Sequence, residues 1–149
     1  MPKGRWELGV FQPMRYGLSE DIEYSIHPLF FFVMPNVTLK MAQKDMYRYK
    51  TATRLKLFYP TPLLNMVARK GIGGLIDPNM IMPPMLGISG SIIASKTIIG
   101  ISTTFNAGID LGINMGKLDQ YSSIDLPLVY HRLGVFYNQW GLHLSLIHI

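Results

Sequence analysis

The longest regular pattern of apolar and polar positions lies between Ile99 and Met115. Odd-numbered positions are apolar except Thr103, and even-numbered positions are small or polar. A period of two predicts an extended strand with one apolar and one polar face. The pattern lasts for about 17 residues, whereas strands of soluble domains rarely exceed about ten, so it predicts a strand of unusual length.

Such a length is typical of a transmembrane β-barrel, where about 9–11 residues of a tilted strand cross the bilayer and the rest extends into loops. We expect the apolar face to contact lipid through Ile99, Ile101, Phe105, Ile109, Leu111 and Ile113. The polar face is expected to line the lumen with two basic residues of another strand, the set being Ser102, Thr104, Asn106, Asp110, Asn114, Arg54 and Lys56. Asp110 is expected to pair there with Arg54 or Lys56.

Two alternatives fit the same alternation. The segment fits one long strand of a soluble β-barrel or sandwich that binds an apolar ligand, with its apolar face pointing inward. It also fits two hairpin strands joined by a turn at residues 106–108. A turn there would leave the alternation in phase on both sides, which argues against the hairpin.

Shorter alternating segments on both sides of this strand predict an all-β fold, an antiparallel meander forming part of a transmembrane β-barrel. The expected strands cover residues 5–12, 22–33, 37–41, 53–59, 86–93 and 133–143, with a tight turn at Lys96-Thr97. About seven strands do not close a barrel, and lipid does not tolerate open sheet edges. We therefore interpret residues 1–143 as a partial barrel domain of a longer protein.

Residues 60–85 lack strand periodicity and predict a long loop that contains a short helix. Thr61 is a candidate cap, Pro62 suits the first turn, and Gly71 lies just past the end of the helical residues 63–70. Long loops are often functional, so this one is a candidate plug or lid for the lumen, with a plain surface loop as the alternative.

The segment Arg15 to Tyr24 reads Arg-Tyr-Gly-Leu-Ser-Glu-Asp-Ile-Glu-Tyr. Gly17 permits a positive φ, and Ser19 and Asp21 can bond nearby backbone groups, which predicts a turn. This sequence resembles the short turns of bacterial outer-membrane β-barrels, which usually join neighbouring strands on the periplasmic side. The resemblance covers about ten residues and implies an outer-membrane location, without implying any functional residue.

Composition and charge exclude some kinds of site but do not decide between these hypotheses. The chain has no cysteine, which excludes disulfides and thiolate metal sites, and no apolar run long enough for a membrane helix. The net charge is +5, concentrated between Lys40 and Lys56. Tyr47 and Tyr49 lie between these basic residues, a combination that is also found in nucleic-acid-binding surfaces. We favour a solvated hairpin tip, or charges that face anionic headgroups or a pore, and expect no nucleic-acid partner.

Both ends of the chain suggest a fragment. Residues 1–8 lack the apolar region of a signal peptide, so an exported protein would need an upstream start. Residues 144–149 resemble the translation of a sequencing adapter, and we interpret them as a non-native tail.

No catalytic or metal-ligand motif is evident, and we expect no cofactor. A lipid-modifying enzyme would need a set such as Ser89 or Ser91 with His131 and Asp125, although residues 87–91 lack the glycine of a nucleophile elbow. The favoured hypothesis is a passive pore or transport component of the bacterial outer membrane, in contact with lipid and open to a small-molecule solute.

Overall fold

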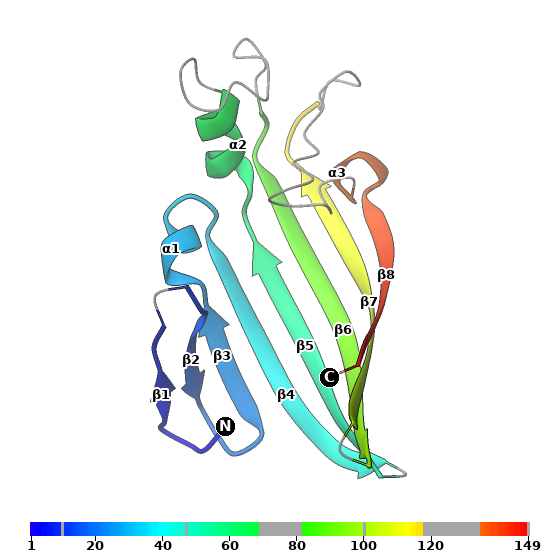
Figure 1. Cartoon of the computed structure of the whole chain (residues 1–149). Coiled ribbons are helices and arrows are strands. Elements are labelled where there is room, and N and C mark those ends of the chain that lie inside the picture. The colour runs from blue at the N-terminus through cyan, green and yellow to red at the C-terminus, as the bar shows by residue number, and fades with distance from the viewer. Residues whose placement is uncertain (10, 47, 69–81, 100, 118–134, 149) are drawn as a thin grey trace.

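The computed structural model describes residues 1–9, 11–46, 48–68, 82–99, 101–117 and 135–148. Its eight strands form a single antiparallel sheet in which each strand pairs with the next along the chain, from β1 to β8 (Figure 1). The all-β antiparallel meander is therefore confirmed. The sheet is not closed, with β1 at one edge and β8 at the other, so closure into a barrel remains a prediction.

The strands are β1 (Trp6–Glu7), β2 (Met14–Gly17), β3 (Ile22–Ile26), β4 (Asn36–Met46), β5 (Tyr49–Phe58), β6 (Met85–Ile98), β7 (Ile101–Asn114) and β8 (Trp140–His148). Three short helices interrupt them: α1 (Pro28–Phe31), α2 (Thr61–Ala68) and α3 (Val135–Asn138). The helices gather at one end of the sheet, and the short turns after β2, β4 and β6 lie at the other end (Figure 1).

The long strand predicted from residue 99 to 115 is present as β7, without a turn at residues 106–108. It pairs with β6 over its whole length, from Ile101 opposite Ile98 to Asn114 opposite Met85. The hairpin alternative is therefore wrong. A strand of this length is stable because both of its edges are occupied, by β6 on one side and β8 on the other.

Several predicted boundaries are wrong, and each has a local cause. Lys96 and Thr97 are not a turn; they continue β6 and pair with Thr103 and Ser102. The chain turns after Ile98 instead, where Ile99 has a φ of 50° and a side chain that is almost fully exposed. Ile99 is thus a turn residue and not part of the apolar face of β7.

The strand predicted over residues 22–33 ends at Ile26, and α1 follows. Pro28 explains the change, because it lacks the N–H that a central strand needs and suits the first turn of a helix. The strand predicted over residues 5–12 is reduced to Trp6–Glu7, and the last strand begins at Trp140, after α3.

The helix predicted within residues 60–85 is α2, while residues 69–81 of the predicted plug or lid lie outside the described part of the chain. Thr61 does more than start this helix. Its hydroxyl donates to the carbonyl of Pro83 at 3.1 Å and accepts the N–H of Met85 at 2.9 Å, so it ties the start of α2 to the start of β6.

A small apolar core lies at the helical end. Phe58 of β5 packs edge-on against Phe136 of α3, with ring centroids 6.1 Å apart. Gly87 and Gly112 leave room for these rings, since a Cβ at Gly87 would collide with the Phe58 ring and one at Gly112 would collide with α3. Away from this end, the described residues build no comparable core between the sheet and a second layer.

Candidate functional site

The two faces of the sheet carry different residues, and the strand register shows this row by row. Residues paired directly across neighbouring strands point to the same face. One row that crosses all eight strands is aromatic and aliphatic apart from one glycine: Trp6, Tyr16, Tyr24, Leu39, Leu55, Gly90, Ile109 and Leu142. We call this side the outer face.

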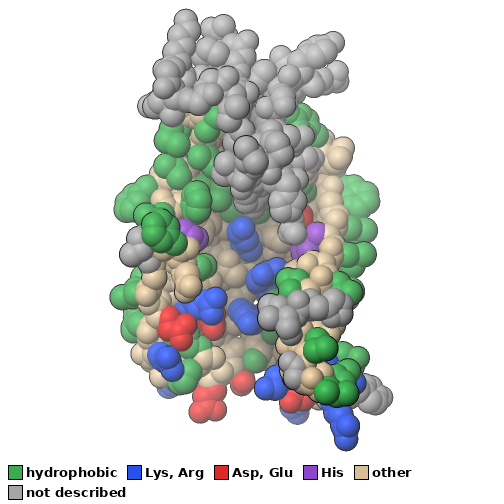
Figure 2. All heavy atoms as spheres, viewed as in Figure 1, with side chains coloured by type: hydrophobic (Ala, Val, Ile, Leu, Met, Phe, Trp, Pro, Cys, Tyr) green, Lys and Arg blue, Asp and Glu red, His purple; other side chains and the backbone are tan. Residues whose placement is uncertain are grey.

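The adjacent rows on the opposite side are polar and charged, and we call that side the inner face. One row consists of Glu7, Arg15, Ser25, Thr38, Lys56, Ser89, Asp110 and Gly141. The next consists of Gly17, Glu23, Lys40, Arg54, Ser91, Gly108 and His143. Figure 2 shows Lys and Arg side chains in the hollow of the sheet and hydrophobic side chains along its flanks.

The outer face is exposed in spite of its composition. Ile109 is 51% exposed and Leu142 is 70% exposed. The outer face also carries an apolar groove of about 690 Å³ above Gly90, where a Cβ would meet no atom within 4 Å. Nothing in the described part of the chain covers these side chains.

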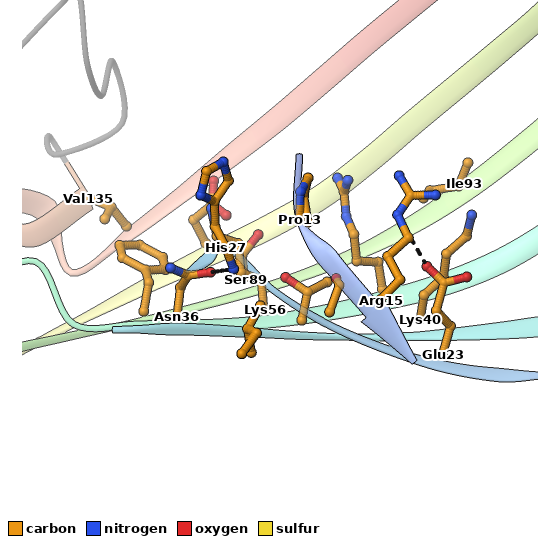
Figure 3. Close-up of a pocket in the computed structure, with 16 residues that line it drawn as sticks. Pro13, Arg15, Glu23, His27, Asn36, Lys40, Lys56, Ser89, Ile93 and Val135 are labelled. Carbon is orange, nitrogen blue, oxygen red and sulfur yellow. Dashed lines mark hydrogen bonds and ion pairs between the residues drawn. The ribbon is translucent and has the colours of Figure 1, made fainter. Parts of the chain in front are cut away.

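The inner face curves around a cavity of about 510 Å³ that residues from β2 to β7 line (Figure 3). We call it the inner cavity. Its described charged residues are Arg15, Glu23, Lys40, Arg54, Lys56 and Asp110. Arg15 Nε lies 3.9 Å from a carboxylate oxygen of Glu23, and Figure 3 shows this pair beside Lys40. Arg54 donates from Nε to the hydroxyl of Ser91 at 3.3 Å.

A buried Asp–His pair lies near the β8 edge of the inner face. His143 Nδ1 is 3.0 Å from Asp110 Oδ2, and the two side chains are only 7% and 10% exposed. Gly108 makes this possible, because a Cβ there would collide with the His143 ring and with the carbonyl of Gly90. His143 Nε2 is buried and has no hydrogen-bond partner among the described residues.

The structure divides the predicted site residues as their alternation indicates, except at Ile99. The exposed apolar residues of β7 are Ile101, Phe105, Ile109, Leu111 and Ile113. Asp110, Arg54 and Lys56 line the inner cavity. Thr104 bonds the Ser95 hydroxyl at 2.9 Å, and Asn114 donates to the carbonyl of Phe136. Contact with lipid and with a lumen remains a prediction for both sets, as does an ion pair of Asp110 with Arg54 or Lys56.

The basic run between Lys40 and Lys56 does not act as one patch. Lys40, Arg54 and Lys56 line the inner cavity, and Lys40 is exposed as well. Lys44, Arg48 and Lys50 are exposed near the turn between β4 and β5 and are not among the lining residues. Arg48 itself adopts a positive φ of 69° in that turn. The interpretation of the basic run as a solvated hairpin tip therefore applies to Lys44, Arg48 and Lys50 and not to the residues that line the cavity.

The lumen-facing set predicted from the sequence left out Arg15, Glu23, Lys40 and His143, which lie on the inner face. A signal was present, because each lies between apolar neighbours that alternate outward, as Leu142 and Leu144 do around His143. Residues 144–148 continue β8, and their interpretation as a non-native tail stays a prediction.

The described residues contain no group of three His, Asp or Glu side chains that could hold a metal ion. Two of the candidate catalytic residues of a lipid-modifying enzyme, Ser89 and Ser91, lie on β6. The other two, His131 and Asp125, fall outside the described residues. No helix within the described ranges has the length and apolar character needed to cross a bilayer. No protein-family model, curated protein or solved structure matches the chain.

Proposed function

We propose that the chain is part of an outer-membrane β-barrel that serves as a passive pore or as a component of a transport system. The observation that carries this proposal is the exposed apolar outer face. A soluble protein rarely leaves a contiguous apolar patch larger than a few hundred Å² uncovered. In lipid the same side chains are the favourable surface, and alternation of apolar-out with polar-in is the pattern of membrane strands.

Two further features support the proposal. Outer-membrane barrels have short turns at one end and longer connections at the other. Here the turns after β4 and β6 are short, whereas the connections after β3, β5 and β7 contain the three helices and lie at the opposite end. The inner face is also polar enough to line a watery path, with four basic residues among the described residues of its cavity.

The alternative of a soluble protein that binds an apolar ligand requires the apolar face of β7 to point inward. Ile109 and Phe105 are instead exposed on the outer face, and the middle of the inner face is cationic. This distribution favours the membrane protein. A lipid-modifying enzyme stays a prediction without a described Ser–His contact behind it.

Spin labels along β7 test the orientation directly. The chain has no cysteine, so each engineered cysteine gives a single labelling site. In lipid vesicles we expect labels at Phe105 and Ile109 to collide with oxygen, which partitions into lipid. Labels at Ser102 and Asn106 should collide with a water-soluble nickel chelate, because they lie on the other face of the same strand.

The same labels can contradict the proposal. Nickel access at Phe105 and Ile109, with oxygen access at Ser102 and Asn106, would place the apolar face in water. Equal access at all four positions would mean that the strand does not separate lipid from water, and the membrane role would then be rejected.

A further inference from the structure

The inner cavity brings three basic side chains together on two adjacent strands. Lys40 of β4 is directly opposite Arg54 of β5, and Lys56 is the next inner-facing residue of β5. All three line the same cavity. Like charges directly opposite each other destabilise a sheet, so this arrangement is costly unless negative charge lies close by.

The described acidic residues of the cavity lie close to basic ones, and Glu23 of β3 is directly opposite Lys40. Glu23 lies 3.9 Å from Arg15, and Asp110 lies 3.0 Å from His143. Among the described lining residues, four are basic and two are acidic. The described lining residues therefore carry an excess of positive charge in a partly enclosed space, where Coulomb interactions are screened less than in open water.

Neutral hydrogen-bonding groups surround the same space. The hydroxyl groups of Ser25, Thr38 and Ser89 line it, and each can donate a hydrogen bond. His27 lines it as well, and its ring Nδ1 is buried without a hydrogen-bond partner among the described residues. The volume of about 510 Å³ falls within the usual range of small-molecule sites, about 300–1,000 Å³.

We propose that the inner cavity binds a small solute through an oxyanion group, a carboxylate or a phosphate, held by Lys40, Arg54 and Lys56. Rings and clusters of Arg and Lys are the usual way in which pores select anions. A planar guanidinium next to two ammonium groups suits oxygens that spread over one anionic group. The inference deepens the proposed function and rests on it, since it treats the inner face as the solute path.

Calorimetric titration of the folded full chain in detergent micelles tests the site without requiring a pore. The probes are inorganic phosphate, succinate and, as a cation of similar size, putrescine. We expect heat of binding with phosphate, with succinate or with both, and none with putrescine. Binding of phosphate alone would assign the site to phosphate groups, and binding of succinate alone would assign it to carboxylates.

Two double variants distinguish anion binding in the cavity from nonspecific attraction to the positively charged protein. Lys40→Gln with Lys56→Gln removes one lysine from β4 and one from β5 inside the cavity. Lys44→Gln with Lys50→Gln removes one lysine from each of the same strands at positions that do not line the cavity. We expect the first pair to weaken anion binding by about ten-fold or more, and the second by less than about two-fold. Circular dichroism of both confirms that the sheet still forms.

A salt titration of the unmodified chain gives a check that does not depend on any variant. Anion affinity should fall as NaCl is added, because the Debye length shortens from about 30 Å at 0.01 M to about 3 Å at 1 M. Equal losses in the two double variants, binding of putrescine as tight as that of the anions, or no anion binding at all would overturn the site.

The failure of this inference can be told from the failure of the proposed function. If the spin labels on β7 show the lipid orientation and no anion binds, the anion site is rejected and the membrane role stands. If anions bind and the labels show the reverse orientation, the site stands on a protein that is not a membrane barrel.

Discussion

The outer and inner faces of the sheet differ in composition and in charge. Along β7, Ile109 and Leu111 face outward and are about half exposed, whereas Asp110 between them faces inward and is buried. A difference of one residue position thus separates an apolar surface from a buried Asp–His pair. A sheet with alternating residues can present two unlike environments without a second layer of structure.

The glycines of the two faces also differ in how closely other atoms pack against them. On the inner face, Gly87, Gly108 and Gly112 each make room for a ring or a helix. On the outer face, Gly90 faces open space. Substitutions on the inner face therefore test packing, and those on the outer face test the surroundings of the protein.

The largest expected effect comes from placing the same charge on each face. Ile109→Lys adds an ammonium group to the middle of the outer face, and Ile93→Lys adds one to the inner cavity. In vesicles, a lysine on the lipid face near the bilayer centre lowers the free energy of unfolding by about 2–4 kcal/mol. We expect Ile93→Lys to cost about 1 kcal/mol or less, because water can reach that side chain.

Urea titration of both variants in lipid vesicles measures the difference. Ile93→Gln serves as a control for the loss of the isoleucine side chain alone. A larger loss at Ile93 than at Ile109 would reverse the proposed assignment of the two faces.

The sequence was sufficient to predict the two faces because they depend on local alternation. The parity of residues 101–114 predicts which side chains of β7 are exposed, and the register bears out this division. It was sufficient for α2 as well, because Pro62 and the apolar residues after it form a local signal. Both features are encoded within a few neighbouring residues.

The turn after β6 could not be predicted in the same way. Ile98 and Ile99 are β-branched residues that favour strands, and a positive φ is unusual for such a side chain. The polar pair Lys96-Thr97 is a stronger turn signal by composition, but it lies within the register of β6 and β7. Long-range pairing along the hairpin outweighed the local preference at this position.

The contact of Asp110 with His143 could not be predicted from the sequence for a different reason. His143 belongs to another strand, and the prediction of β8 began at residue 133 instead of Trp140. The pair depends on the register of β7 with β8 and on the absence of a side chain at Gly108. Neither is visible until the strands are aligned.

A smaller effect comes from the two glycines that pack in opposite ways on neighbouring strands. Gly108→Ala forces a methyl group against the His143 ring and the Gly90 carbonyl, and overpacking of this kind costs about 1–3 kcal/mol. Gly90→Ala adds a methyl group to the open groove of the outer face, so we expect a change within about 0.5 kcal/mol.

Thermal or urea unfolding of the two alanine variants under identical conditions gives this comparison. Gly108→Ala should cost less in a His143→Ala background than in the unmodified chain, because one of the two groups that the methyl contacts is then absent. Equal costs at Gly90 and Gly108 would show that the outer groove is as tightly packed as the inner face.

The smallest expected effects distinguish two polar side-chain pairs of the inner face. The Asp110–His143 pair is buried, with its atoms 3.0 Å apart, whereas the Arg15–Glu23 pair is longer at 3.9 Å and half exposed at the arginine. Double-mutant cycles with alanine isolate each pairwise term from the other contacts of the four residues. We expect a coupling of about 1.5 kcal/mol for the buried pair and less than about 0.5 kcal/mol for the exposed one.

The two couplings should also respond differently to salt. Added NaCl should reduce the Arg15–Glu23 coupling towards zero, since exposed charges are screened, and should leave the Asp110–His143 coupling largely unchanged. Such a result would mean that the inner face is dry at the β7–β8 edge and wet near β2 and β3. Equal couplings with equal salt dependence would mean that water reaches both, and His143 would then be a solvated surface residue instead of part of a buried pair.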